Sequence, residues 1–296
     1  MPDFKIETDL IPLGCALAEN LARPIPERAQ VALHWLGQAG FAVRSSGCLL
    51  LIDPYLSDSL ARKYRGSEFP HERMMPAPIL PGELHGVSAV LCTHRHSDHM
   101  DPETLSVIAA ANPECSIVVP RAEIDHALSL GLPASSLRGL AAGESLSLCP
   151  GVDVEALPSA HETLLVNDKG EHHHLGYILS LAGIRLYHSG DFVPYDGLAA
   201  ALRARAVNIA LLPVNGRSTL LSRKGIIGNF FFDEAVQLCR DANIPLLVCH
   251  HFGMFAFNTI DLTRHAREID SRREGAPRCV IPDAGSLIAL RAPPHA

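Results

Sequence analysis

Four side chains that bind metals fall within six residues of the sequence, in the segment His94-x-His96-x-Asp98-His99. Imidazole nitrogen and carboxylate oxygen together suit a divalent metal ion such as zinc or manganese. The segment directly follows residues 87–92, an apolar run typical of a buried strand, so we expect these side chains on a loop. A loop can turn some of them toward one metal and the rest toward a second. The pattern therefore predicts a metal centre at the end of this strand.

Three later residues carry the same chemistry in the same kind of place. His161, Asp191 and His251 each follow a segment that we expect to be a strand. Taken singly, each is equally well explained as a helix cap or a buried structural histidine. Taken together, they put metal-binding groups beyond the ends of successive strands, where the ligand site of a sheet is expected. We therefore expect them to complete the centre.

The elements that must position these residues are both strands and helices. The first strands are expected to form an antiparallel meander, and later strands alternate with helices, which predicts a layered α/β or α+β domain. Strands are expected at 31–36, 41–44, 48–52, 87–92, 116–119, 152–157, 176–181, 184–187, 208–212 and 245–249, and helices at 102–112, 122–130, 198–205, 233–242 and 259–273. Residues 1–30 are expected to be an N-terminal extension, and 31–296 a single catalytic domain. The proline-rich stretch 56–86 is expected to be a lid or binding loop.

Several further stretches accompany the metal-binding segment. They are Trp35 to Phe41, Asp53 to Ser57, Pro158 to His161, Leu175 to Tyr177, His188 to Asp191, Leu212 to Arg217, Gly228-Asn229, and His251 with Met254-Phe255. With these motifs the sequence resembles the metallo-β-lactamase superfamily, and most of all its UlaG-type branch, named for L-ascorbate-6-phosphate lactonase. The resemblance spans roughly residues 31 to 260.

The resemblance implies a four-layer αββα sandwich with a site for two divalent metal ions, Mn or Zn. Asp191 would bridge the two metals, and Asp53 would orient the ligands from behind them. Asp98 and Asp191 would be the catalytic carboxylates, with Asp98 able to relay a proton. The resemblance assigns His94, His96 and His161 to one metal and Asp98, His99 and His251 to the other. A metal-bound hydroxide would then attack a carbonyl or phosphoryl centre.

The substrate is less closely defined by the sequence. Asn215, Arg217 and Asn229 lie in one glycine-containing region and are expected to bind a small anionic substrate, a lactone or a phosphoester. A solvated basic loop or a subunit contact would explain the same residues. Relatives carry an acidic residue two positions after the last histidine, where this chain has Gly253. That departure bears on the lactonase activity and leaves the metal ligands unaffected.

Composition narrows the function further. The 296 residues carry 25 Lys and Arg against 32 Asp and Glu, a formal charge of −7, so general binding to nucleic acid is not expected. No apolar run approaches the length of a membrane span. Alternatives from other classes are a phosphodiesterase acting on phospholipid or nucleic acid, a diiron oxidoreductase, and a metal-binding scaffold or sensor without catalysis.

The remaining expectations concern the cellular setting. The eight cysteines are scattered singly, and most stand in apolar contexts. We interpret them as small buried hydrophobic residues of a cytoplasmic protein in a reducing compartment. The apolar segment Asn229 to Phe232 favours a homo-oligomer. Among His172, His173 and His174, expected at the tip of a hairpin, His174 is the residue expected nearest the site.

Overall fold

Two β-sheets stacked face to face form the centre of the protein. The computed structural model describes residues 7–11, 15–27, 29–262 and 276–292. The first sheet has eight strands in the order β1 (Glu7–Ile11), β15 (Leu287–Arg291), β2 (Val31–Gly37), β3 (Gly40–Ser45), β4 (Cys48–Ile52), β5 (Val87–Leu91), β6 (Ser116–Pro120) and β7 (Leu137–Leu140). The second has seven, in the order β14 (Arg278–Val280), β13 (Leu246–His250), β12 (Ile209–Pro213), β11 (Ile184–His188), β10 (Leu175–Leu181), β9 (Val152–Pro158) and β8 (Ser145–Cys149).

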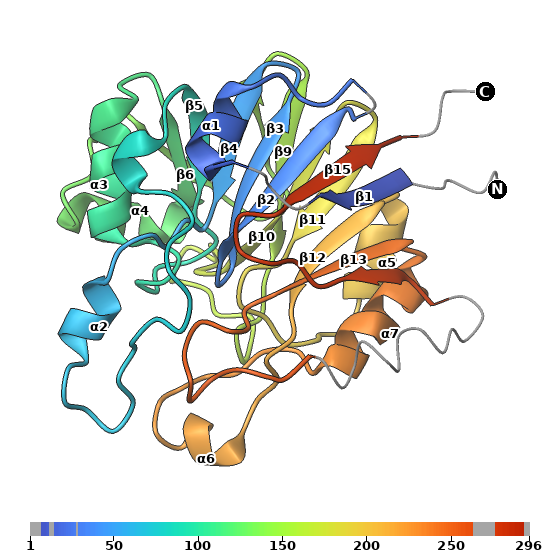
Figure 1. Cartoon of the computed structure of the whole chain (residues 1–296). Helices are drawn as coiled ribbons and strands as arrows, with labels where there is room; N and C mark the ends of the chain where they lie inside the picture. The colour runs from blue at the N-terminus through green and yellow to red at the C-terminus, as the bar shows by residue number, and fades with distance from the viewer. Residues whose placement is uncertain (1–6, 12–14, 28, 263–275, 293–296) are drawn as a thin grey trace.

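Helices cover the outer face of each sheet, which makes four layers and confirms the expected αββα sandwich (Figure 1). Helices α1 (Leu17–Ala22), α3 (Pro102–Ala111) and α4 (Ile124–Ser129) pack on the first sheet. Helices α5 (Leu198–Ala204) and α7 (Phe232–Ala242) pack on the second. Apolar side chains fill the space between the sheets, and burying each large one stabilises the fold by about 1.5–3 kcal/mol. Strand β2 is buried along its whole length because it is covered on both faces.

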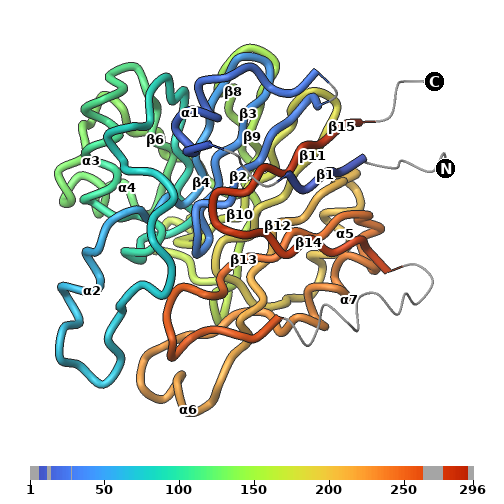
Figure 2. Tube along the Cα trace, in the orientation of Figure 1, coloured from blue at the N-terminus to red at the C-terminus, as the bar shows by residue number. Residues whose placement is uncertain are grey.

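Each sheet combines an antiparallel meander with parallel strands. In the first sheet β4, β5, β6 and β7 run parallel, and in the second β11, β12, β13 and β14 do so. The loops that leave the carboxyl ends of these strands meet at one end of the sandwich, where α2 (Ser59–Lys63) and α6 (Thr219–Ser222) also lie (Figure 2). That end is where the sequence predicted the site.

The beginning of the chain, expected to be an N-terminal extension, packs against the first sheet. Residues 7–11 form β1, which pairs with β15, and Leu17 of α1 is buried in the core under the first sheet. The expected helix at 259–273 is not formed over its described part, residues 259–262, and its remainder lies outside the described residues. Within the described residues, no helix is long and apolar enough to cross a membrane.

The interpretation of all eight cysteines as reduced residues is wrong for two of them. Cys48 in β4 and Cys149 in β8 form a disulfide, so the two sheets are covalently joined. The partners are 101 residues apart, and the pairing of strands from different sheets cannot be seen in the spacing of cysteines along the chain. The other six are free, and Cys92, Cys115, Cys239 and Cys249 are buried as expected.

Candidate metal centre and active-site cavity

The structure brings all seven predicted metal ligands together in two neighbouring groups. Ligand atoms within each group lie within 4.8 Å of one another. The histidine group consists of His94, His96 and His161, and the mixed group consists of Asp98, His99, Asp191 and His251. Four of these residues follow β5 in the first sheet, and the other three follow strands β9, β11 and β13 of the second. The centre is therefore built across the interface between the sheets.

A glycine allows the two sheets to approach closely at this point. Gly190 has a φ of +66°, and a Cβ placed there would lie 2.6 Å from the hydroxyl oxygen of Thr93, which follows β5. Any side chain at position 190 would push the end of β11 away from the end of β5. The next residue, Asp191, reaches the Nε2 atom of His99 at 3.2 Å and that of His251 at 3.0 Å. Gly190 thus permits the carboxylate to stand between the two imidazoles.

Asp53 anchors the loop after β5 through hydrogen bonds. This carboxylate is fully buried at the end of β4. It accepts hydrogen bonds from the backbone N–H of Thr93 at 2.7 Å, from the Thr93 hydroxyl at 2.6 Å and from the Nδ1–H of His99 at 2.7 Å. Because a carboxylate only accepts, the proton of His99 is fixed on Nδ1 and its Nε2 faces Asp191. This is the orienting position that the sequence indicated for Asp53.

The protonation tendencies of the two groups differ. Burial lowers the pKa of His161 to about 4 and that of His94 well below its usual value, with the neighbouring imidazoles of His99 and His96 acting on His94 in the same direction. These histidines are therefore neutral and have nitrogen lone pairs to donate. In the mixed group burial opposes the charge, but the carboxylates of Asp191 and Asp98 together outweigh burial and raise the pKa of His251 to about 9.

The donor atoms fit divalent metal ions. The Nδ1 of His161 is buried and has no hydrogen-bond partner among the described residues. The buried Nε2 of His99 and Oδ1 of Asp191 lie 3.2 Å apart but form no well-aligned hydrogen bond. Leaving such atoms without partners costs free energy, and a cation in each group would satisfy them. Histidine nitrogens with carboxylate oxygens are a ligand set that zinc and manganese both accept.

Gln38 is a site residue to which the sequence gave no role. Its side-chain amide nitrogen lies 2.9 Å from the Oδ2 of Asp98 and 2.9 Å from the Nε2 of His251, and its backbone carbonyl oxygen accepts the backbone N–H of His251. The residue lies in the turn between β2 and β3, within the Trp35 to Phe41 stretch. Gln38, Asp53 and His251 all have positive φ, an uncommon conformation for residues other than glycine that clusters at functional sites.

His174 lies beside the histidine group, as the sequence suggested. Its ring centroid is 5.1 Å from that of His94 and 5.3 Å from that of His161, and its Nδ1 is buried without a hydrogen-bond partner among the described residues. Burial lowers its pKa to about 3. His173 points elsewhere and lies 2.6 Å from Glu123.

Gly253 is the position where the sequence departs from the UlaG-type pattern. Its φ is +67°, and a Cβ there would lie 2.9 Å from the terminal carbon of Met75. A side chain at this position would therefore be strained and would displace Met75. The backbone N–H of Gly253 donates to the Thr259 hydroxyl at 2.7 Å.

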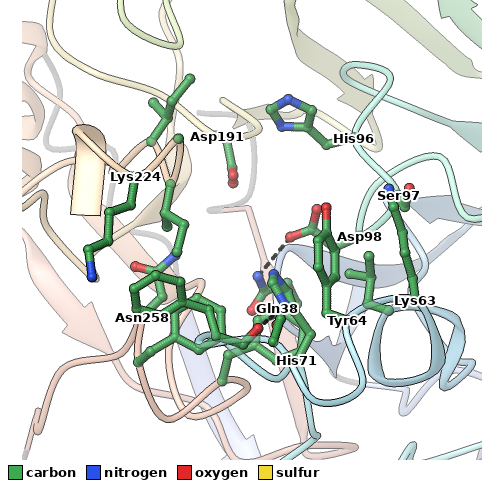
Figure 3. A pocket seen from close by; sticks show the side chains of 18 of the residues that line it. Gln38, Lys63, Tyr64, His71, His96, Ser97, Asp98, Asp191, Lys224 and Asn258 are labelled. Carbon is green, nitrogen blue, oxygen red and sulfur yellow. Dashed lines mark hydrogen bonds between the residues drawn. The ribbon is translucent and has the colours of Figure 1, made fainter.

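A cavity of about 690 Å³ opens over the metal-binding residues. His96, Asp98, His161, Asp191 and His251 line it, and Figure 3 shows the carboxylates of Asp98 and Asp191 pointing into it. Residues of the proline-rich stretch 56–86 form much of its wall, as a binding loop would. Other parts of the wall come from residues 224–227, from Phe255, Phe257 and Asn258, and from Gln38, Arg95, Ser97 and His126.

The three residues expected to bind substrate stand apart from this cavity. Arg217 makes a two-pronged ion pair with Glu234, with both distances 2.6 Å, and its guanidinium stacks on Phe231. Asn229 is fully buried and accepts the backbone N–H of Phe192, next to Asp191. The structure thus gives Arg217 an acidic partner of its own.

Asn215 connects this region to the cavity through amide groups. Its oxygen accepts from Asn229 at 3.0 Å, and its nitrogen donates to Asn258, a cavity residue, at 2.8 Å. Asn215 and Arg217 line a separate hollow of about 250 Å³. In this arrangement Asn229 and Asn215 support the loop of Asp191 from outside the cavity.

Known proteins share the sequence pattern and the fold of this chain. Residues 49–252 match the model of the "Beta-lactamase superfamily domain". A UPF0173 metal-dependent hydrolase of Myxococcus xanthus is 26% identical over 281 residues, which is 93% of this chain and 88% of the relative.

Two solved structures share the fold. A possible metal-dependent hydrolase from Veillonella parvula is 20% identical with a TM-score of 0.69, covering 88% of this chain and 100% of that one. An isothiocyanate hydrolase from Delia radicum gut bacteria is 18% identical with a TM-score of 0.68, covering 87% and 98%.

Proposed function

Since this chain belongs to the β-lactamase superfamily and is a metal-dependent hydrolase of it, we propose that it hydrolyses a small anionic substrate, a lactone or a phosphoester, at a two-metal centre. The observation that carries the proposal is the pair of ligand groups at the base of one cavity. A cavity of about 690 Å³ is the size that holds a small molecule. It favours such a substrate over a phospholipid or nucleic acid chain.

The residues of the cavity have separable tasks. His94, His96 and His161 would hold one metal, and Asp98, His99 and His251 the other, with Asp191 between them. When bound, zinc or manganese would activate water and polarise the substrate oxygen. Asp98 has a side chain that is 17% exposed, and its pKa stays well below the usual value because the neighbouring His99 and His251 offset the effect of burial. Its Oδ2, which accepts a hydrogen bond from Gln38, is therefore ionised and would accept a hydrogen bond from the attacking water.

Positive charge at the cavity supports an anionic substrate. Lys63, Arg95 and Lys224 line the cavity; Lys224 is paired with Glu68, and the other acidic lining residues, Asp98 and Asp191, belong to the proposed metal centre. Lys63 and Arg95 are left to attract an anion, in a chain whose formal charge is −7. These cavity cations support an anionic substrate more directly than the residues around Arg217 do, because they line the same cavity as the proposed metal centre.

The test combines metal analysis with hydrolysis assays. The protein is purified without chelator or histidine tag, its metals are counted, and lactones and phosphoesters are screened with Mn²⁺ and Zn²⁺. We expect about two metals per chain. His96→Ala and Asp191→Asn should bind less metal and lose at least 100-fold in kcat/KM, whereas the exposed His85→Ala should change neither. Full activity in either site variant would overturn the two-metal proposal.

A further inference from the structure

Five aromatic rings form one continuous side of the cavity, here called the aromatic wall: Tyr64, Phe69, His71, Phe255 and Phe257. His71 is at its centre, stacked on Tyr64 at 4.2 Å and meeting Phe257 edge-on at 4.7 Å. Phe255 and Phe257 are parallel, with centroids 5.9 Å apart. These spacings are those of favourable ring pairs.

The wall is held in place before any ligand arrives. The Nδ1–H of His71 donates to the carbonyl of Phe69 at 2.8 Å, which fixes that ring. Phe255 is buried in a cluster with Tyr55, Leu60 and Met254. The N–H of Met74 donates to the Met254 carbonyl at 2.8 Å and joins the two segments that supply the rings. A preformed wall loses little entropy when a ligand packs on it.

Two cations that line the cavity have no acidic partner among the described residues. Lys224 is paired with Glu68. Lys63 and Arg95 also line the cavity, and neither forms an ion pair among the residues that the structure describes. Lys63 lies over the Tyr64 ring at 5.1 Å, and Figure 3 draws it on the side of the cavity opposite Lys224. Their charge is available to a ligand.

The wall and these cations face the same cavity as Asp98 and Asp191. We propose that the substrate is an aryl anion: an aromatic group that packs on the aromatic wall, joined to an anionic group held by Lys63 and Arg95, with its scissile bond at the metal centre. This inference rests on the proposed hydrolysis and names its substrate class. A fully polar substrate would leave the wall in contact with water and gain nothing from it.

Binding of inert probes tests the inference without any reaction. Isothermal titration of the metal-loaded protein compares 2-naphthalenesulfonate with methanesulfonate, which lacks the ring, and with 2-naphthalenemethanol, which lacks the charge. Sulfonates bind metals weakly and are not hydrolysed here, so the affinities report on the wall and the cations. We expect 2-naphthalenesulfonate to bind at least 10-fold more tightly than either of the others.

Matched variants separate the two contributions. Phe257→Leu should weaken the binding of 2-naphthalenesulfonate about 3- to 10-fold, which is the range of an aromatic contact. The affinity for methanesulfonate should not change. Phe231→Leu, at a ring outside this cavity, is its control. Lys63→Met should weaken the binding of both sulfonates and leave the affinity for the alcohol unchanged. Arg65→Met is its control, because it removes the same charge from an exposed residue outside the cavity.

The outcomes distinguish the two proposals. Equal affinity for the aryl and methyl sulfonates, or equal effects of Phe257→Leu and Phe231→Leu, would overturn the aryl-anion inference even if esters are hydrolysed. The expected binding pattern in a protein that hydrolyses neither lactones nor phosphoesters would support the inference about the ligand and count against the proposed reaction.

Discussion

Replacing Asp53 by asparagine should weaken metal binding although Asp53 is not itself among the proposed ligands. The carboxylate accepts three hydrogen bonds, two from Thr93 and one from the Nδ1–H of His99. In Asp53→Asn the amide oxygen can still accept the Thr93 N–H, but the amide NH₂ then faces His99. The ring of His99 is driven to place its proton on Nε2, the atom that must coordinate the metal.

The magnitude follows from the contact that is lost. One hydrogen bond to a buried charge contributes about 1.5–3 kcal/mol, and Thr93 can turn its hydroxyl to accept from the new amide, so we expect a stability loss of about 2–3 kcal/mol. Loss of an orienting partner lowers metal affinity by about 10- to 100-fold. The two effects are measured separately, by denaturant unfolding of the metal-free protein and by competition with a chromophoric chelator for Zn²⁺ or Mn²⁺.

A second buried aspartate supplies the control. Asp101 caps α3 and accepts the N–H and hydroxyl of Thr104. Asp101→Asn should change stability by no more than about 1 kcal/mol, because asparagine caps a helix about as well as aspartate, and should leave metal affinity unchanged. If Asp53→Asn binds metal as the wild type does, or if Asp101→Asn weakens binding equally, Asp53 does not act through His99.

Three further predictions concern stability and binding elsewhere in the chain. The double variant Cys48→Ala with Cys149→Ala should lose about 4–5 kcal/mol of unfolding free energy because the disulfide closes a loop of about 100 residues, and reductant should abolish the difference from wild type. Burial lowers the pKa of His34 to about 4, below its unfolded value, so its contribution to stability is complete above about pH 6.5 and is lost toward pH 4. In unfolding titrations, His34→Asn should therefore reduce the pH slope in that window by at most about 1.4 kcal/mol per pH unit. Arg217→Met should leave KM for an anionic substrate within two-fold of wild type, because Arg217 is paired with Glu234; a ten-fold rise in KM would restore a substrate-binding role.

The local part of the site was predictable, because short-range pattern and chemistry coincide there. The His94 to His99 segment carries four ligands in one loop, and the strand before it is continuously apolar. His161, Asp191 and His251 follow strands whose boundaries the sequence indicated to within a residue or two. Side chains of different strands converge at the strand ends. The occurrence of metal-binding residues after several strands therefore predicted a shared site.

Features of the site that depend on contacts between distant segments could not be predicted from the sequence. The acidic partner of Arg217 is 17 residues away on α7, and nothing in the spacing distinguishes an internal ion pair from a free anion site. The aromatic wall joins the loop after β4 to the loop after β13, and its rings look like ordinary hydrophobic residues in each segment alone. Strand β8 was missed although its serines and leucines alternate, because only two such pairs occur.

The position of β15 has a consequence for how the protein is made. This strand fills the gap between β1 and β2, pairing Leu290 with Val31 and Leu287 with His34. A ribosome releases residues 31–45 long before residues 287–291. Through most of synthesis β2 therefore has one edge that is apolar and unpaired. An edge of this kind is a template for pairing with other chains. We therefore expect the yield of soluble protein in a cell to depend on β15, even though every proposed metal ligand is synthesised earlier.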